Sequence, residues 1–370
     1  MNETSISTKQ EIRRFLLDRK FDKLFVLSGQ NSYVKSGAKK FLDPILKNKE
    51  AFIYLKKSYY PEFNELKKIN NFMRKFQPNL IVAIGGGSVL DYAKIINVLK
   101  FSPNLKEEIK NLSYSFKNKL ATLVAIPTTA GSGAEVTTNA VIYINKVKYS
   151  IEGNLVKPDY FFLVPDFVSK SSNKLKSSAG FDAISQGLES IISIKSNSKS
   201  INFAKKSLFY SLKYFVPSLQ HPNMENISKM CLAANLSGKA ISISKTTAPH
   251  AVSYPFTAYY GISHGHAVSL TLEKFLKFNF KNIDAANTYF NLRKKFEIIF
   301  NLTKTKNILE LQSYLNKMKK EANLNDNLRQ LGINIHNDYS KIISNVNLQR
   351  LENNPIKIER KDLKKILISL

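Results

Sequence analysis

The sequence predicts two domains of different class, an α/β domain with a Rossmann-like parallel sheet over residues 1–165 and an all-helical domain over residues 166–370. Three observations lead to this prediction. The length of 370 residues suits two domains of ordinary size. In the first part, short apolar runs alternate with helical periods, which is typical of a parallel sheet covered by helices on both faces. After Pro165 the helical periods continue, but strand patterns become rare.

Short apolar runs mark the expected strands of the first domain. We expect these strands at residues 23–28, 51–55, 80–84 and 120–126. The stretches between them have helical spacing, and they predict helices at residues 34–46 and 91–99. Strand, helix and strand in alternation would return the chain to the same edge of the sheet each time, as parallel pairing requires.

The second domain shows apolar residues at helical spacing, separated by Ser, Asn and Gly breaks. We expect helices at residues 184–194, 200–215, 227–241 and 362–370. The boundary near Pro165 is placed where this change of pattern begins.

Composition and charge exclude several classes of protein. Lys and Arg number 56 against 28 acidic residues, a net charge of +28, yet these residues are spread along the chain and form no basic block. Spread charge of this kind is typical of a solvated surface rather than a nucleic-acid tail. A single cysteine, Cys231, excludes a disulfide framework. No membrane span or signal peptide is evident, so we expect a cytoplasmic protein that binds neither membranes nor nucleic acid.

A glycine loop follows the third expected strand, in LIVAIGGGSVLDYAK (residues 80–94). Gly85, Gly86 and Gly87 allow a tight turn and a close approach of the backbone to a ligand. Ser88 and Asp91 have the spacing of a helix N-cap and its capping-box partner. A helix that begins at such a loop can bind an anion such as a pyrophosphate, although the spacing differs from that of G-x-G-x-x-G.

A second loop of glycines and hydroxyl residues follows the fourth expected strand, in AIPTTAGSGAEVTTN (residues 125–139). Its Thr128, Thr129 and Ser132 carry hydroxyl groups that could donate hydrogen bonds. In open α/β sheets, ligands bind beyond the carboxyl ends of the strands. Two such loops at two strand ends therefore favour a nucleotide site over two unrelated turns.

A second group of residues, which combines a carboxylate, an amide and histidines, indicates a site for a divalent metal ion. Asp182 and Gln186 lie four residues apart in GFDAISQ (180–186), which we expect to open a helix, so they share one helical face. Three of the five histidines lie in residues 246–267: His250, His264 and His266. A carboxylate and two imidazoles from separate helices can enclose a cation and leave a position open, as a Lewis-acid site requires.

Together these motifs resemble the iron-containing (group III) alcohol dehydrogenase family, whose architecture is like that of dehydroquinate synthase. The resemblance starts near residue 20 and keeps the order and spacing of the motifs. They are GGGSVLDYAK (85–94), PTTAGSGAEVT (127–137), PDYFFLVPD (158–166), GFDAISQGLES (180–190), PHAVSYPFTAYYGISHGHAVSL (249–270) and NNPIKIERKDLKKIL (353–367).

The resemblance implies a cofactor site for NAD(H) or NADP(H). The residues that it places there are Gly85, Gly86, Gly87, Ser88, Asp91, Lys94, Thr128, Thr129 and Ser132. The loop after the first strand adds Gly29, Asn31 and Ser32, and it contains no acidic residue. An acid there usually binds the ribose 2′-hydroxyl of NAD, and the loop is similar to that of family members that use the 2′-phosphate. We therefore favour NADPH.

The resemblance also implies the metal ligands, Asp182, Gln186, His250 and His264, for Fe²⁺ or Zn²⁺. The family usually has histidine at position 186 and a second histidine at position 254, where this chain has Tyr254. A neutral amide is a poor ligand for such a metal, so a three-ligand zinc site and a metal-free site stay open. Tyr254 or His266 could replace the lost histidine in proton transfer.

One subgroup of the family, the phosphonoacetaldehyde reductases of phosphonate biosynthesis, resembles this chain closely in SISKTTAPHAVSYPFT and FDAISQGLES. In that subgroup glutamine at position 186 is ordinary. The resemblance implies reduction of phosphonoacetaldehyde to 2-hydroxyethylphosphonate. The anionic aldehyde would need a cation near the metal, for which Lys245 and Lys148 are candidates.

Other functions stay open. The same family contains general short-chain alcohol or aldehyde dehydrogenases and polyol dehydrogenases. A lyase of the dehydroquinate synthase type should carry more basic site residues. A nucleic-acid-binding protein on a retired enzyme scaffold would bind duplexes in a salt-sensitive manner. A homodimer is one assembly that this interpretation allows.

Overall fold

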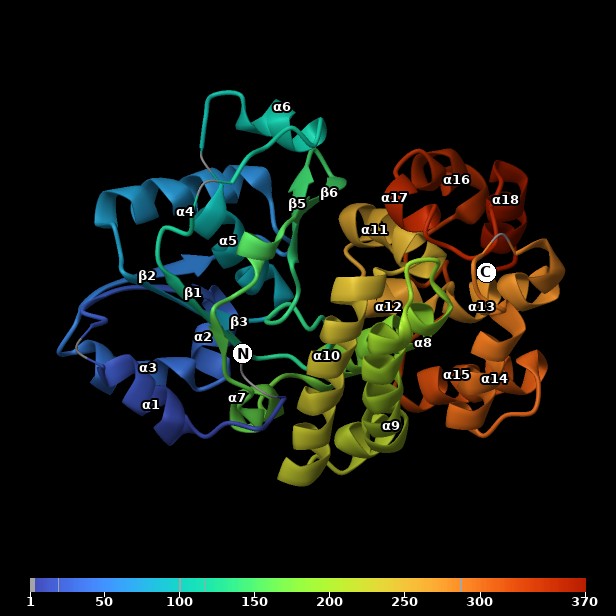
Figure 1. The fold of residues 1–370 in the computed structure, drawn as a ribbon, viewed down its shortest axis with the longest axis horizontal. Coiled ribbons are helices and arrows are strands. Elements are labelled where there is room, and N and C mark those ends of the chain that lie inside the picture. Colours follow the sequence, from blue (N-terminus) through green and yellow to red (C-terminus); the bar gives the residue numbers. More distant parts are fainter. Residues whose placement is uncertain (1–3, 19, 100, 117, 287) are drawn as a thin grey trace. The chain divides into compact units, whose positions relative to one another are not determined.

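The computed structural model describes residues 4–18, 20–99, 101–116, 118–286 and 288–370 (Figure 1). The chain forms two compact units, Met1–Ser172 and Asn173–Leu370. The division falls within the short segment after α7 (Pro165–Ser169), so this helix belongs to the first unit. Each unit is described by itself.

The first unit contains a five-stranded parallel sheet in the order β2-β1-β3-β4-β7. Its strands are β1 (Lys23–Gly29), β2 (Glu50–Lys56), β3 (Leu80–Gly85), β4 (Thr122–Pro127) and β7 (Tyr160–Phe161). The four strands expected from apolar runs are thus confirmed, with bounds that differ by one or two residues. The last strand, β7, is too short to show a pattern of its own.

The strand order changes direction at β1. From β1 the chain moves outward to β2, and it then crosses back to place β3 on the other side of β1. Ser28 lies opposite Ile84 in this pair, and its hydroxyl donates a hydrogen bond of 2.6 Å to the Ile84 carbonyl. Such a switch point is where open α/β sheets bind ligands, outside the carboxyl ends of the strands.

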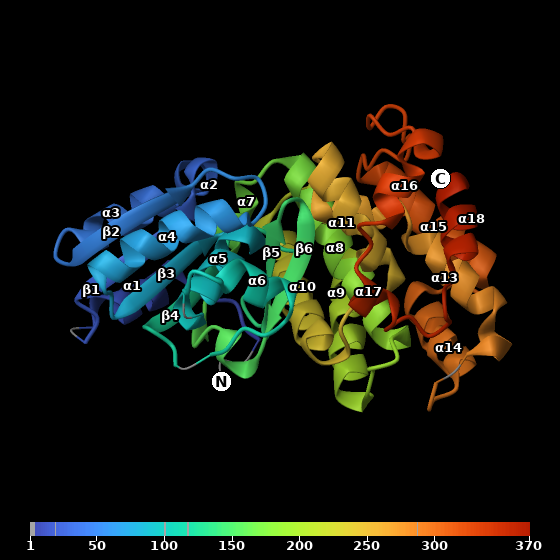
Figure 2. The same cartoon turned by 90° about the horizontal axis from the view of Figure 1, so that it is seen from above.

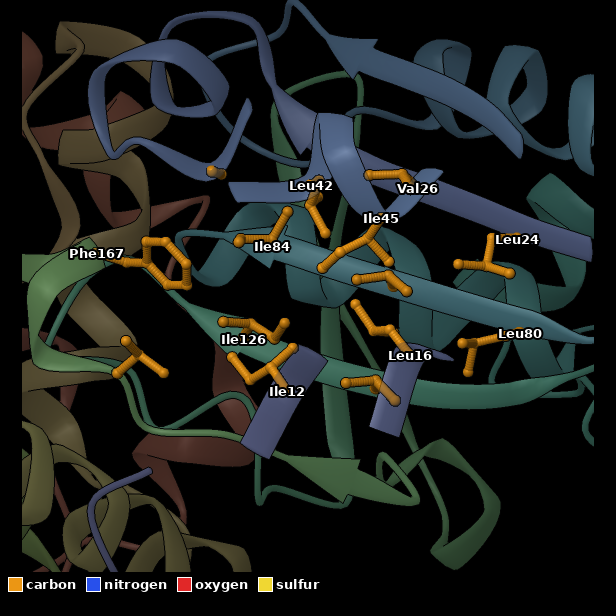
Figure 3. Close-up of a cluster of buried hydrophobic side chains, with 14 of the residues drawn as sticks. Ile12, Leu16, Leu24, Val26, Leu42, Ile45, Leu80, Ile84, Ile126 and Phe167 are labelled. Atoms are coloured by element: carbon orange, nitrogen blue, oxygen red, sulfur yellow. The ribbon is translucent and has the colours of Figure 1, made fainter. Parts of the chain in front are cut away.

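Helices cover both faces of the sheet. On one face, side chains from α1 (Lys9–Leu17) and α3 (Ala38–Leu46) pack on alternate residues of β1, β3 and β4, as Figure 3 shows for Ile12, Leu16, Leu42 and Ile45. On the opposite face, Phe25 and Phe52 stack on each other and pack against Phe76 of α4 (Phe63–Phe76). Both faces are therefore apolar, which explains the continuous apolar runs in the sequence.

The helix expected at residues 34–46 is wrong as a single element. The chain forms α2 (Gln30–Lys35) and then α3, separated at Gly37, whose φ of 82° lies in the left-handed region. Glycine adopts this conformation without steric cost, so it can end one helix and begin the next. The next helices are α5 (Gly87–Val98) and α6 (Leu105–Lys110).

An antiparallel hairpin, which the sequence analysis missed, follows β4. It consists of β5 (Asn139–Ile144) and β6 (Val147–Glu152), joined by Asn145 and Lys146, which have φ values of 52° and 65°. Two central residues with positive φ are the mark of a tight hairpin turn. A 3₁₀ turn, Asn154–Val156, leads on to β7.

The second unit is helical, and its described residues contain no strand. Its helices are α8 (Asn173–Ile192), α9 (Ser198–Gln220), α10 (Met224–Ser244), α11 (Ala248–Tyr260), α12 (His264–Ser269), α13 (Leu272–Lys281), α14 (Leu292–Thr303), α15 (Ile308–Glu321), α16 (Ile335–Ile343), α17 (Leu348–Leu351) and α18 (Arg360–Ile368), with a 3₁₀ turn at Ile283–Ala285. The long helices α8, α9 and α10 pack on one another (Figure 2). The four helices predicted here are confirmed, although residues 180–186 lie inside α8 and do not open it. Among the described helices, none is both long enough and apolar enough to cross a membrane.

Candidate functional site

In the first unit, three loops lie at the carboxyl ends of neighbouring strands, at the switch point. They follow β1 at Gly29, β3 at Gly85 and β4 at Pro127. Gly85 and Pro127 pair in register, and the Thr128 amide donates 2.9 Å to the Gly85 carbonyl. Because the strands are parallel and adjacent, the loops predicted for cofactor binding meet at one edge of the sheet.

The two glycine loops lie against each other. A Cβ atom placed on Gly86 would be 3.6 Å from the Thr129 side chain, and one placed on Gly87 would be 2.8 Å from the Ser132 hydroxyl oxygen. Thr128 is buried, whereas Thr129 and Ser132 are half-buried. A side chain at Gly87 would displace the side chain of Ser132, so glycine lets the start of α5 approach Ser132 closely.

The capping role expected for Ser88 and Asp91 is wrong. Helix α5 begins two residues earlier than the box required, with Gly86 as its N-cap in an extended conformation, and no side chain caps it. Ser88 therefore lies within the first turn. A helix start that is not capped by its own side chains keeps first-turn N–H groups directed outward, which suits an anion.

Asp91 and Lys94 face the hairpin β5–β6 and the second glycine loop. The fully buried Lys94 donates to the Ala134 carbonyl (2.9 Å), the Thr137 hydroxyl (2.8 Å) and the Asn139 carbonyl (2.5 Å). Asp91 accepts a hydrogen bond from the backbone N–H of Val141, and burial raises its pKa to about 6 against the opposing charge of Lys94. Both side chains thus brace the second loop, and the cofactor contact that the resemblance implies for them stays a prediction.

Replacing Lys94 by Met is expected to lower the free energy of unfolding by about 3 kcal/mol, because it leaves buried oxygen acceptors and Asp91 without their cation. Denaturant unfolding measures this loss, and the exposed Lys75 on α4, changed to Met, serves as the control. Unchanged stability together with weaker NADPH binding would instead make Lys94 a direct cofactor contact.

The remaining cofactor candidates lie at the end of β1. Gly29 is the N-cap of α2, and the Ser32 hydroxyl donates 3.2 Å to the Gly29 carbonyl. A Cβ atom on Gly29 would lie 2.7 Å from the Ser32 hydroxyl oxygen. Asn31 is exposed on α2. Gly29, Asn31 and Ser32 thus border the switch point, beside the loop that begins at Gly85.

In the second unit, three side chains form a candidate metal centre. One potential ligand atom each from Asp182 on α8, His250 on α11 and His264 on α12 lies within 4.8 Å of the other two. Asp182 and His250 are buried, with His250 Nε2 3.2 Å from Asp182 Oδ1, and His264 is half-buried. The two imidazoles meet edge to face, with centroids 5.2 Å apart.

Gln186 lies beside Asp182, as the four-residue spacing predicts. Its Nε2 donates 3.2 Å to Asp182 Oδ2, and its Oε1 accepts a 2.8 Å hydrogen bond from the Ser237 hydroxyl on α10. In this orientation the amide holds Asp182 in place through its nitrogen, which cannot bind a metal. Amide orientation follows from the surrounding hydrogen bonds, and here the Asp182 carboxylate selects it, because a carboxylate only accepts.

Glu189 is a member of this cluster that the sequence analysis did not name as a site residue. It is fully buried on α8, 2.5 Å from His250 Nδ1 through Oε1. Its Oε2 accepts hydrogen bonds from the Thr247 amide (2.7 Å) and hydroxyl (2.9 Å). The signal was present in the sequence, because positions 182, 186 and 189 follow the spacing of one helical face.

The charges of this cluster stabilise each other. Burial opposes the charged imidazolium, but Glu189 and Asp182 outweigh it and raise the pKa of His250 to about 9. Burial alone would raise the pKa of Asp182, yet hydrogen bonding to His250 and the charge of His264 hold it below its usual value. A cation that binds His250 must therefore displace a proton.

The close approach of α12 to α8 places His264 in the cluster. A Cβ atom on Gly265 would lie 1.9 Å from the Ser178 carbonyl oxygen and 2.8 Å from Asp182 Cβ. The two helices touch through their backbones at this point. The glycine directly after His264 is thus a condition for bringing this imidazole to Asp182.

The two candidates for proton transfer lie in different places. Tyr254 is buried, its ring stacks on His264 with centroids 5.4 Å apart, and its hydroxyl is hydrogen-bonded to Arg350. Burial raises the pKa of Tyr254 to about 12 although Arg350 opposes the shift. His266 Nε2 is instead 2.7 Å from the Asn325 carbonyl oxygen. The structure therefore groups Tyr254, and not His266, with the metal ligands.

The two candidate lysines differ as well. Lys148 on β6 is buried, and its Nζ donates 2.6 Å to the Ser150 hydroxyl, so its charge serves the hairpin and Asp91. Lys245 is half-buried directly after α10, in the left-handed region with φ of 59°. The two other histidines, His221 and His336, are exposed and lie outside the cluster.

Comparisons with known proteins cover nearly the whole chain. Residues 7–165 match the family model for iron-containing alcohol dehydrogenase, and residues 176–370 match the C-terminal model of the same family. A phosphonoacetaldehyde reductase of Streptomyces viridochromogenes is 31% identical over 217 residues, which cover 56% of this chain and 55% of that protein. A 4-hydroxybutyrate dehydrogenase of Clostridium kluyveri is 30% identical over 217 residues, which cover 56% of this chain and 58% of that protein. The chain thus spans little more than half the length of these relatives.

Solved structures share the fold. The sulfoacetaldehyde reductase of Bifidobacterium kashiwanohense, solved with NAD⁺, has a TM-score of 0.85 at 24% identity and covers 99% of this chain and 95% of its own. A 1,3-propanediol oxidoreductase has a TM-score of 0.84 at 20% identity, covering 97% and 94%. These likenesses agree with the predicted combination of an α/β domain and a helical domain.

Proposed function

Because the chain belongs to the iron-containing alcohol dehydrogenase family, we propose that it is a metal-dependent NAD(P)H oxidoreductase that reduces a small aldehyde to an alcohol. Its substrate in this proposal is phosphonoacetaldehyde and its product 2-hydroxyethylphosphonate. The observation that carries the proposal is the buried cluster of Asp182, His250 and His264. The proposal includes the cytoplasm as location and phosphonate biosynthesis as process.

The donor set suits a divalent transition metal. Two imidazoles and one carboxylate leave coordination positions open, and such sets bind Zn²⁺ or Fe²⁺. Asp182, His250 and His264 would hold the ion, while Gln186 would support Asp182 as a hydrogen-bond donor. A bound metal supplies Lewis-acid polarisation of the aldehyde oxygen, and a bound nicotinamide supplies hydride transfer.

The residues of the chain bind, orient and hold protons. The loops at Gly29, Gly85 and Thr128 would bind the cofactor, with the start of α5 directed toward its pyrophosphate. The phenol of Tyr254 keeps its proton at neutral pH, as its raised pKa indicates, and is fixed by Arg350. We assign Tyr254 Oη as the group that holds a proton for the developing alkoxide.

The absence of an acid in the loop after β1 supports NADPH over NADH. Residues 28–32 read SGQNS, and Lys35 follows closely. A carboxylate at this position would repel a ribose 2′-phosphate and attract a 2′-hydroxyl.

The anionic substrate is supported by Lys245 and by the relative that reduces phosphonoacetaldehyde. A non-glycine residue with φ of 59° is uncommon and costs about 1 kcal/mol, and such strain persists where the surrounding structure imposes it, often at functional sites. Lys245 is five residues before His250, so the turn that it forms leads directly into the helix of a metal ligand.

The test is oxidation of NADPH and NADH by the metal-loaded protein with phosphonoacetaldehyde, acetaldehyde and butyraldehyde at equal concentration. The proposal expects the phosphonate to be turned over preferentially, with NADPH. Equal turnover of the neutral aldehydes would reduce the function to that of a general aldehyde reductase, and turnover of none of them would contradict it.

Replacing Lys245 by Ala is expected to raise KM for phosphonoacetaldehyde about tenfold or more, because one charge-assisted contact contributes about 1.5–3 kcal/mol. The KM for acetaldehyde should be unaffected. Steady-state kinetics measure both values, and the exposed Lys199 on α9, changed to Ala, is the control. An equal rise for both aldehydes would assign Lys245 to the folding of the turn and not to the anion.

The second candidate is the same reaction on a carboxylated aldehyde. The 4-hydroxybutyrate dehydrogenase relative, at 30% identity over the same share of the chain, favours it. Adding the aldehyde of 4-hydroxybutyrate to the assay separates the two, since a preference for it over phosphonoacetaldehyde would select this candidate.

A further inference from the structure

The carboxyl group of Glu189 is enclosed by the protein. The side chain is fully buried on α8. An isolated carboxylate in such a position is strongly unfavourable, so its charge must be compensated by hydrogen bonds and by positive charge. The compensation comes from His250 on one carboxylate oxygen and from Thr247 on the other.

The contact with His250 decides which ring nitrogen can face a metal. A carboxylate only accepts hydrogen bonds, so the Nδ1 atom 2.5 Å from Glu189 Oε1 must carry a hydrogen. The Nε2 atom then faces Asp182 Oδ1 at 3.2 Å and is the atom that can bind a cation there. One carboxylate thereby sets both the tautomer and the rotation of the imidazole.

The contact with Thr247 positions the whole helix α11. Thr247 is the N-cap of α11, yet its side chain makes no capping hydrogen bond within that helix. Its amide and hydroxyl are both directed to Glu189 Oε2, 58 positions away in the sequence. Because His250 lies one turn after Thr247, the anchoring of Thr247 also fixes the position of the His250 backbone that carries the imidazole.

The charge balance of the cluster gives Glu189 a further part. Among the three side chains that can hold the ion, only Asp182 is an anion, and Gln186 is neutral. A buried divalent cation with a single carboxylate would retain one uncompensated positive charge. Glu189 would contact the ligand His250 and not the ion itself. It supplies the second negative charge inside the same buried cluster.

We propose that Glu189 is a positioning residue of the metal site, which orients His250 through Nδ1, anchors the start of α11 through Thr247 and balances the charge of a bound divalent cation. This inference rests on the metal dependence in the proposed function. It assigns a role that follows from contacts between segments far apart in the sequence.

The experiment measures Zn²⁺ binding to the metal-free protein, with neither cofactor nor aldehyde, by competition with a chromophoric chelator. Glu189→Gln is expected to raise the Zn²⁺ dissociation constant about 10–100-fold, the usual effect of losing such a partner. Ser185→Ala on the same helix is the matched control, since the buried Ser185 hydroxyl donates to the Phe181 carbonyl and has no part in the contacts of Glu189 with His250 and Thr247. Its dissociation constant should stay close to that of the unaltered protein.

A second readout needs no variant. In the unaltered protein with Zn²⁺ bound, ¹⁵N NMR of labelled histidine is expected to show His250 protonated at Nδ1 and coordinated through Nε2. Coordination through Nδ1 would overturn the inference, even if Glu189→Gln failed to fold. An equal loss of affinity in Glu189→Gln and Ser185→Ala would also overturn it, because a general disturbance of α8 would then explain the effect.

These outcomes are distinct from those of the aldehyde assay. A protein that binds Zn²⁺ as described but reduces no aldehyde would contradict the proposed function and support the role of Glu189. A protein that reduces aldehydes while Glu189→Gln binds Zn²⁺ as tightly as before would contradict the role of Glu189 alone.

Discussion

Replacing Asp182 by Asn is expected to abolish tight metal binding and to lower kcat for aldehyde reduction about a thousandfold, equivalent to about 4 kcal/mol of transition-state stabilisation. Asp182 is the only carboxylate among the three grouped ligand side chains, and it is buried beside His250 and Gln186. An amide keeps the shape but removes the charge. Metal content after dialysis and steady-state kinetics with NADPH measure the two effects.

The control for Asp182 is Ser185→Ala on the same helix, because the Ser185 hydroxyl is buried and donates to the Phe181 carbonyl, within the same helix. This variant should retain both metal and turnover. If Asp182→Asn kept its turnover, or if chelator-treated protein were as active as before, the metal would have no part in the reaction.

Replacing Gly265 by Ala is expected to destabilise the helical unit by about 3 kcal/mol and to weaken metal binding at the same time. The added methyl group would lie 1.9 Å from the Ser178 carbonyl oxygen, which belongs to the backbone of α8 and cannot rotate away. Helix α12 must therefore move outward and carry His264 away from Asp182. Urea unfolding and the Zn²⁺ dissociation constant measure the two consequences.

Gly261→Ala is the matched control for Gly265. A methyl group on Gly261 would meet nothing within 4 Å, although its φ of 65° imposes a cost of about 1 kcal/mol. We expect a small loss of stability and unchanged metal affinity. Wild-type stability in Gly265→Ala would show that α12 can repack, and the close approach would then not determine the position of His264.

The strands of the first unit could be predicted because burial on both faces produces continuous apolar runs. β1, β3 and β4 are such strands, and their predicted bounds differ from the structure by at most two residues. The division of the segment 34–46 into two helices could not be predicted from periodicity, because apolar spacing continues on both sides of Gly37. The hairpin β5–β6 could not be predicted either, because its turn residues, Asn145 and Lys146, do not include the glycine that usually marks such a turn.

Part of the candidate site could likewise be predicted from the sequence, and part could not. The grouping of Asp182, His250 and His264 followed from residue types with strong metal chemistry in a recognisable order. The partners of the buried charged groups could not be inferred from residue types or spacing. Lys94 and Asp91 sit in a motif associated with the cofactor, yet they brace the second loop and the hairpin. Their spacing is compatible with either role.

By itself, the sequence determined the combination of an α/β and a helical domain and four strands of the parallel sheet, because these depend on periodicity, and its motifs identified the family. Only the tertiary structure decided which residues meet. Glu189 acquires its role from Thr247 and His250, 58 and 61 positions away, and His264 reaches Asp182 because Gly265 lets two helices touch. The physical reason is that a buried charge or a missing side chain has its effect through neighbours in space, and long-range packing selects those neighbours.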